Sequence, residues 1–399
     1  MRTDAIRPGA GLILLLGLLE AFGPLSMDLY MPALPELARS LGIGDALAQT
    51  TMSVCMLGLG LGQLIAGPLS DRFGRCPPLL IGVAAFAAFS AACAVAPAVG
   101  WLLLFRALQG VSGAAGMVVT LAIARDIFAG AQLARMLSWL ALVGAVAPVV
   151  APILGGQLSR FLDWRGIFWV LAGIGVLLLA SAMRWLPESH PRELRRTGSG
   201  SLALLADARV LLAHPAYRAV LLISAVSGAA FFAYLSMSSF VLQNGFGVTP
   251  AVFGVLFAAG SLCNVVGSQT NRVLLSSTSP ERLYLLGMAL AFAGSAIAAA
   301  SALFGLGLAP FVAGLAIYLA STGFTMPNAS AIGLTAHGDR AGSAAALLGT
   351  SSLLLGPVVA PLVSLPGVTS AVLGLTMAVA SALVLAVGLA AFGRAPRRP

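Results

Sequence analysis

Charge is scarce in this chain of 399 residues, and lysine is absent. Only 9% of the residues are charged, whereas a typical soluble domain has about 25%, and 59% are hydrophobic. The mean hydropathy is +0.99. This composition excludes an ordinary soluble domain and predicts an integral membrane protein with little material outside the bilayer. The net charge of +9 does not indicate nucleic acid as a partner, because the arginines follow the loops between apolar runs.

Cysteine and histidine are equally sparse. The four cysteines form no C-x-x-C pair, so we expect no disulfide framework. The three histidines lie in short polar loops away from cysteines and carboxylates, which argues against a metal site. The apolar runs hold no Ser/His/Asp constellation, and the chain has no phosphate-binding G-x-x-x-x-G-K-S/T loop. We therefore predict neither an enzyme nor a cofactor.

Apolar runs of membrane-spanning length dominate the sequence. Crossing a bilayer takes roughly 20 apolar residues. The first run contains Glu20 and Asp28, which are unsuited to a cleaved signal. We predict an all-α integral membrane protein with twelve transmembrane helices at 9–32, 47–69, 78–98, 101–123, 134–158, 165–186, 217–241, 251–274, 282–303, 307–332, 342–364 and 369–392.

The arginines give the chain an orientation. Eighteen of the 22 fall in one alternate set of connecting segments, and the opposite set has only Arg39, Arg160 and Arg165. Positive loops stay in the cytoplasm, so both termini are predicted to be cytoplasmic. The longest polar stretch predicts a linker at 191–215 between six-helix bundles at 1–190 and 216–399. The segment PVVAP occurs in the fifth span of each half, at 148–152 and 357–361, which indicates two pseudo-symmetric repeats.

Away from the ends of the predicted spans, the only charged residues are Glu20, Asp28 and Arg106. A charge at the bilayer centre costs about 3 kcal/mol on insertion scales, so such groups face a cavity or a partner. Glu20 and Asp28 would lie about 12 Å apart along an ideal helix, too far to share a proton, although both can border one cavity. Gly23 and Pro24, which lie between them, are expected to kink or loosen the helix. A dry cavity favours the neutral form of a carboxyl, as a proton carrier requires. The alternative is a static ion pair between helices.

The segment GPLSDRFGR at 67–75 joins the second and third predicted spans. It resembles the signature G-x-L-x-D-R-x-G-R of the major facilitator superfamily at six positions; the alternative is a generic cytoplasmic loop. Gly67 and Gly74 are expected to let the backbone turn. This resemblance predicts two pseudo-symmetric halves working by alternating access, with a conformational latch formed by Gly67, Asp71, Arg72, Gly74, Arg75 and Asp126.

Two contacts of this latch are predicted. Arg75 is expected to pair with Asp126. Asp71, for which no partner is evident in its own loop, is expected to approach the helix that begins near Gly342 and Ser343, because a helix N-terminus favours an anion.

Further segments narrow the resemblance to the bicyclomycin-resistance/CflA drug exporters: GPLSMDLYMPALP at 23–35, RALQG at 106–110, ARDIF at 124–128, APVVAPILGG at 147–156 and MPNA at 326–329. It implies that Asp28 carries the proton and that Arg106 takes part in its transfer. It also implies an antiporter motif in the fifth span, comprising Gly144, Pro148, Pro152, Gly155 and Gly156. Those prolines and glycines are alternatively explained by helix packing. Cys76, Ala147 and Glu20 depart from the usual pattern, and a second acid could admit cationic drugs.

Polar and aromatic residues in the spans are candidates for contacts with substrate. For the aromatic residues, packing or contact with lipid is the alternative. The candidates are Tyr30, Gln63, Gln109, Phe232, Tyr234, Met237, Asn264 and Asn328.

Together, these patterns predict a proton-coupled efflux antiporter of small amphipathic compounds, of bicyclomycin, phenicol or multidrug type. The alternative is a proton-coupled transporter dedicated to one metabolite, working in import or in export of a self-made product. We expect a multi-pass monomer in the bacterial cytoplasmic (inner) membrane. Its partners would be the lipid bilayer, protons and a small-molecule substrate, with the proton gradient in place of a cofactor.

Overall fold

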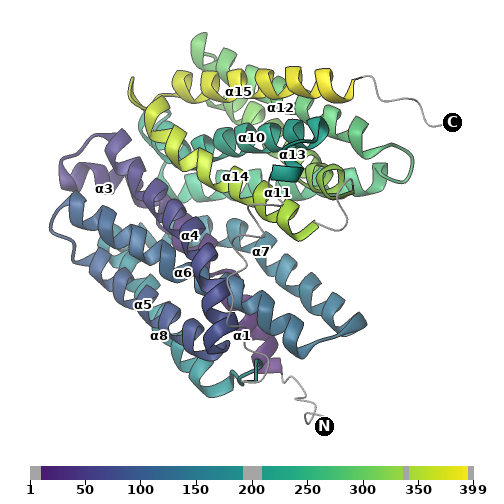
Figure 1. Ribbon diagram of the computed structural model, residues 1–399. Coiled ribbons are helices and arrows are strands. Elements are labelled where there is room, and N and C mark those ends of the chain that lie inside the picture. The colour runs from purple at the N-terminus through teal and green to yellow at the C-terminus, as the bar shows by residue number, and fades with distance from the viewer. Residues whose placement is uncertain (1–9, 192–208, 336–340, 394–399) are drawn as a thin grey trace. The chain divides into compact units, whose positions relative to one another are not determined.

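The computed structural model describes residues 10–191, 209–335 and 341–393, which are helical apart from short connections. The chain forms two compact units, one of Met1–Ile43 with Val54–Ser199 and one of Gly44–Ser53 with Gly200–Pro399 (Figure 1). Most of the predicted linker lies outside the described residues. Helix α8 ends at Trp185 on one side of it, and α10 begins at Pro215 on the other.

The first unit is built from helices joined by short connections. Helices α5 and α8 pack together, α5 also packs on α6, and α1 and α2 both contact α7. Its helices are α1 (Ala10–Glu20), α2 (Phe22–Asp28), α3 (Leu34–Leu41), α5 (Cys76–Ala94), α6 (Val99–Ile127), α7 (Gly130–Leu158) and α8 (Trp164–Trp185), together with most of α4 (Asp45–Phe73).

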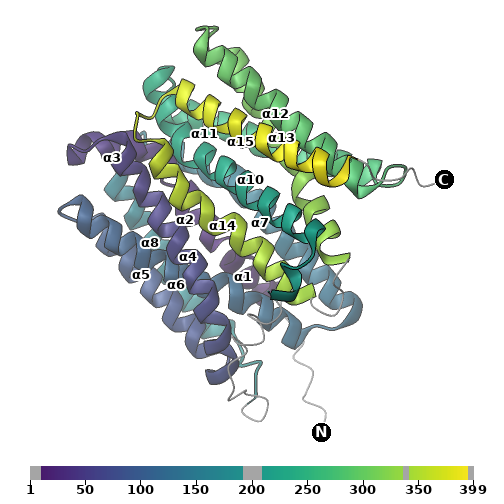
Figure 2. The same ribbon diagram turned by 45° about the horizontal axis from the view of Figure 1, so that its top comes forward.

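The second unit is likewise helical. Helix α12 packs along α13 and α15, α10 packs along α14, and α11 lies against α13 (Figure 2). The helices are α10 (Pro215–Phe240), α11 (Pro250–Leu274), α12 (Pro280–Leu303), α13 (Leu308–Thr335), α14 (Ala341–Val363) and α15 (Ser370–Phe392).

Ten helices in the described residues are long and apolar enough to cross a membrane, and a bent pair in the first span would make eleven. A shorter apolar helix, Leu347–Val363, lies within α14. Eleven of the twelve predicted spans therefore match helices α4–α8 and α10–α15 to within a few residues.

The first span, predicted for 9–32, is bent, as expected from Gly23 and Pro24. It bends by 55° between residues 11–20 and 25–41, and α1 gives way to α2 at Ala21. Proline has no backbone N–H, so Pro24 cannot donate to the carbonyl of Glu20 four residues earlier. The ideal-helix spacing of Glu20 and Asp28 therefore does not apply.

Side-chain caps and prolines define several helix starts. Asp163 accepts a hydrogen bond from the backbone N–H of Gly166 (2.8 Å), and Thr369 accepts one from that of Val372 (3.2 Å). Such caps satisfy backbone donors that have no partner within the helix. Helices α5, α10, α11 and α12 have proline in the first turn, where its missing N–H costs nothing.

Helix α7 is continuous through Pro148 and Pro152. A lost hydrogen bond is tolerated in a spanning helix when neighbouring groups compensate for it. Gly155 has a packing role, because a Cβ there would overlap the carbonyl oxygen of Leu29. A Cβ at Gly144 would meet nothing within 4 Å.

Helices α4 and α6 approach closely because glycines face backbone at their crossing. A Cβ on Gly110 would overlap the carbonyl oxygen of Cys55, and a Cβ on Gly58 would overlap that of Ala107. Small residues permit such close approach in membranes, where packing replaces the hydrophobic effect between helices.

We expect Gly110→Ala to lower the apparent unfolding temperature of the purified protein in detergent. Overpacking of this kind costs about 1–3 kcal/mol. Gly100→Ala is the matched control, because a Cβ at that position of the same helix meets nothing within 4 Å. Equal stability of the two variants would contradict the close crossing.

Candidate functional site

Arg106 on α6 is fully buried in the first unit. Its Nη1 donates to the carbonyl oxygen of Ser26 (3.2 Å) and to Oε1 of Gln109 (2.5 Å). Its guanidinium carbon also lies 4.4 Å from the centroid of the Tyr30 ring. A desolvated cation over an aromatic face gains about 2 kcal/mol, so these contacts offset part of the cost of burying the charge.

A chain of hydrogen bonds extends from Arg106 to α5. Gln109 Nε2 donates to Ser90 Oγ (2.7 Å), and that hydroxyl donates to the carbonyl oxygen of Phe86 (2.7 Å). Gln109 is fully buried. The amide thus fixes the Arg106 guanidinium between the first span and α5.

Asp28 ends α2 and is only 6% exposed. Within the described residues, no hydrogen bond or ion pair joins its carboxyl to another side chain. Glu20, at the end of α1, has a buried Oε2 that also lacks a hydrogen-bond partner there. Both acids and Arg106 belong to the first unit, and the acids lie on either side of the break at Ala21.

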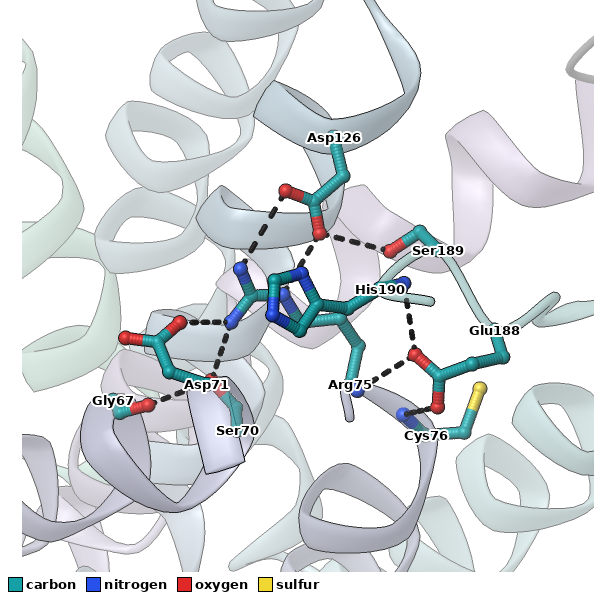
Figure 3. Close-up of polar contacts among 9 residues, drawn as sticks. All are labelled: Gly67, Ser70, Asp71, Arg75, Cys76, Asp126, Glu188, Ser189 and His190. Atoms are coloured by element: carbon teal, nitrogen blue, oxygen red, sulfur yellow. Dashed lines mark hydrogen bonds and ion pairs between the residues drawn. The ribbon is translucent and has the colours of Figure 1, made fainter. Parts of the chain in front are cut away.

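A second polar cluster surrounds Arg75, between α4 and α5 (Figure 3). Its Nε donates to Oδ2 of Asp126 at the end of α6 (2.8 Å), as predicted. Its Nη1 donates to Oδ1 of Asp71 (2.6 Å) and to Ser70 Oγ (2.8 Å). Burial lowers the pKa of Arg75, but the bonds to Asp126 and Asp71 outweigh it and raise the pKa above its ordinary value. The guanidinium therefore stays charged.

Two expectations for this segment are wrong. Asp71 does have a partner in its own segment, because α4 continues to Phe73 and places Asp71 one helical turn before Arg75. Gly67 lies inside the same helix and does not turn the chain. Gly74 alone of the pair has a positive φ, of 94°, which suits glycine.

Three residues of the segment after α8 complete the cluster and were not predicted. Glu188 accepts hydrogen bonds from the backbone N–H groups of Arg75 (2.8 Å) and Cys76 (3.2 Å), at the start of α5. The backbone N–H of His190 also donates to Glu188 (3.0 Å). Ser189 Oγ donates to Asp126 (3.1 Å) (Figure 3). A carboxylate favours a helix N-terminus, but this contact could not be found from local sequence, because 112 residues separate Glu188 from Cys76.

Arg72, which was assigned to the latch, lies over the ring of Phe73 instead.

The predicted substrate contacts divide between the two units. Tyr30 and Gln109 surround Arg106, and Gln63 lies half-buried on α4. In the second unit Phe232, Tyr234 and Met237 are buried, and Tyr234 stacks on Phe257 (5.6 Å between centroids). Asn264 donates to Thr322 (2.5 Å), and Asn328 donates to Asn271 (2.7 Å).

A cavity of about 370 Å³ lies within the second unit, between α10, α12, α13 and α14. None of the five substrate contacts predicted in that unit is among its described lining residues. Its wall is rich in hydroxyl groups instead, including Ser227, Thr325, Ser330 and Ser352. Scattered serines and threonines gave no sequence signal for it.

Comparisons with known proteins agree with this architecture. Residues 16–361 match the Major Facilitator Superfamily. The chain is 36% identical to the uncharacterised MFS-type transporter YdgK of Bacillus subtilis over 374 residues, 93% of each chain. The chain belongs to the major facilitator superfamily.

Other similarities refine the placement of this superfamily member. It is 31% identical to the bicyclomycin resistance protein homolog of Haemophilus influenzae, over 88% of each chain. The crystal structure of a point mutant of the nucleoside transporter NupG has a TM-score of 0.79 and 14% identity, covering 95% of this chain and 99% of that one, and shows the fold alone. The protein is therefore a multi-pass membrane transporter for a small molecule, related to drug-resistance proteins.

We expect Asp126→Asn to destabilise this transporter more than Asp71→Asn. The side chain of Asp126 is 20% exposed and accepts from both Arg75 and Ser189, whereas that of Asp71 is 49% exposed. Losing a hydrogen bond to a charged group costs about 1.5–3 kcal/mol, and an exposed pair is worth less than about 1 kcal/mol. The measurement is the apparent unfolding temperature of each variant in detergent. An Asp126→Asn variant as stable as Asp71→Asn, or more stable, would contradict this expectation.

Proposed function

We propose that the protein is a proton-coupled efflux antiporter of small amphipathic compounds that works by alternating access. The observation that carries the proposal is Asp28, a buried carboxyl with no side-chain partner among the described residues. A carboxyl in that setting favours its neutral form, and it can ionise when water or a cation reaches it. Its protonation can thus respond to which side of the membrane is open.

Arg106 provides the second element of the coupling. Its Nη1 bonds to the carbonyl of Ser26, two residues before Asp28 in the chain. A cation held in this span stabilises the ionised form of a carboxyl when the two approach and releases it when they separate. A shift of the first span relative to α6 would therefore change the proton affinity of Asp28.

The energy available suffices for drug export. One proton moving down 100 mV gives about 2.3 kcal/mol, and one pH unit adds about 1.4 kcal/mol. Since about 1.4 kcal/mol is tenfold in concentration, exchange of one proton for one neutral molecule sustains an outward gradient of roughly 500-fold.

The remaining assignments belong to the same proposal. The arginine distribution supports cytoplasmic termini in the bacterial inner membrane. The cluster around Arg75 supports the latch, because its hydrogen bonds connect the ends of α4 and α6 to the start of α5. A conformational change would have to move these three helix ends together or break the bonds. The surroundings of Gly342 and Ser343 lie outside the part of the structure that is described, so the approach of Asp71 to that helix stays a prediction. The drug-resistance relatives support export of antibiotics.

Replacing Asp28 by asparagine should abolish proton-driven efflux, because the amide cannot carry the proton. The measurement is accumulation of labelled chloramphenicol in cells, with and without a protonophore. Glu281→Gln, in the first turn of α12, is the control for loss of a carboxylate elsewhere. Efflux by Asp28→Asn at the wild-type rate, with equal protein in the membrane, would refute the assignment of the carrier.

Replacing Glu20 by glutamine should weaken export of cations more than export of neutral drugs. The physical reason is that the buried Oε2 of Glu20 would offer a charge to a cation. Parallel assays with tetraphenylphosphonium and chloramphenicol measure the selectivity. Equal losses for the two compounds would assign Glu20 to coupling or folding instead.

A further inference from the structure

The hydroxyl-rich cavity of the second unit has the size and lining of a ligand site. Its volume of about 370 Å³ falls in the range of small-molecule pockets, roughly 300–1,000 Å³. Phe231, Met326 and Leu353 supply an apolar surface, and serine and threonine hydroxyls lie among them. Such a mixture suits a molecule with an apolar body and a few polar groups.

Three hydroxyls of this cavity donate to backbone carbonyls of their own helices. Thr325 Oγ1 donates to the carbonyl oxygen of Thr322 (3.5 Å), and Ser330 Oγ donates to that of Met326 (3.2 Å). Ser352 Oγ donates to the carbonyl oxygen of Leu348 (3.0 Å). A hydroxyl has one proton and two lone pairs. Each of these oxygens therefore keeps a lone pair that can accept a hydrogen bond from a ligand.

Fixed charge is missing from the described lining. Those residues include no Asp, Glu, Arg or His, and the phenol of Tyr284 is neutral at physiological pH. Without a counter-charge, an ion entering the cavity would lose its hydration uncompensated. A neutral molecule with O–H or N–H donors would gain hydrogen bonds instead.

We propose that this cavity binds neutral amphipathic molecules through their hydrogen-bond donors, with Thr325, Ser330 and Ser352 as acceptors. The substrate class rests on the proposed function, whereas the binding itself does not require proton coupling. The cavity thus takes neutral donor-bearing drugs, and selection of cations is left to Glu20 in the other unit.

Gly349 offers a way to fill the cavity without distorting the helix. It lines the space, and a Cβ there would meet nothing within 4 Å. Gly349→Leu should therefore occupy the ligand volume, while Gly349→Ala should leave most of it open.

Thr325→Val and Ser352→Ala each remove one hydrogen-bond acceptor while the shape of the side chain stays nearly constant. Ser181→Ala, on α8, removes a hydroxyl with the same backbone bond (2.7 Å) outside the cavity.

The experiment is equilibrium binding of labelled chloramphenicol, which has hydroxyl and amide donors, to the purified full-length protein. Its diacetate, in which both hydroxyls are blocked, and tetraphenylphosphonium, a cation without donors, serve as competitors. We expect Gly349→Leu to lose at least about tenfold in affinity and Gly349→Ala to stay within about twofold. Thr325→Val and Ser352→Ala should each lose about three- to tenfold, as for one hydrogen bond, and Ser181→Ala should lose nothing.

Unchanged chloramphenicol affinity in Gly349→Leu would overturn the site, and so would a wild-type protein that fails to bind chloramphenicol. Competition by the diacetate or by tetraphenylphosphonium as strong as by unlabelled chloramphenicol would overturn the ligand class. Thermal unfolding of each variant separates a lost site from a lost fold. In another outcome, the purified protein binds as expected while efflux from cells is unaffected by a protonophore. That pair of results would support the binding site and refute the proton-coupled function.

Discussion

The hydrocarbon region of a membrane offers no water to a charge, and this constraint decides where the ionisable groups of the protein can lie. The buried charge of Arg106 is stabilised by the Ser26 carbonyl, the Gln109 amide and the Tyr30 ring, all in the first unit. Asp28 has no such side-chain partner in the described structure, so its neutral form is favoured. This difference is the reason why we propose Asp28, and not Arg106, as the group that exchanges a proton.

The same absence of water shapes the backbone. Every N–H and C=O in lipid needs an internal partner, which leaves helices as the spanning elements of this chain. Where close packing is required, glycine provides it, as at Gly110 against Cys55 and at Gly155 against Leu29. The contact of Gly155 ties α7 to the segment just after Asp28. Packing of the fifth span and the position of the acid are therefore linked within the first unit.

Much of the fold could be predicted from the sequence, because membrane thickness fixes span length and arginines mark the connections. The pairing of Arg75 with Asp126 was also predicted, as a contact of the latch that the resemblance implies. The bend was expected at Gly23 and Pro24, but the helix breaks at Ala21. The reason is that Pro24 removes the hydrogen bond to a carbonyl four residues earlier in the chain. The roles of Glu188 and of the hydroxyl cavity depend on segments far apart in the chain, and no local pattern reveals which of them meet.

The central claim is that Asp28 exchanges its proton as substrate binds. The most direct measurement is proton release from the purified protein on addition of chloramphenicol, followed with a pH indicator in weakly buffered solution near neutral pH. Comparison of the wild type with Asp28→Asn at equal occupancy isolates this carboxyl. The account predicts that the wild type releases protons on binding and that Asp28→Asn binds without release. Equal release by the two proteins would contradict it.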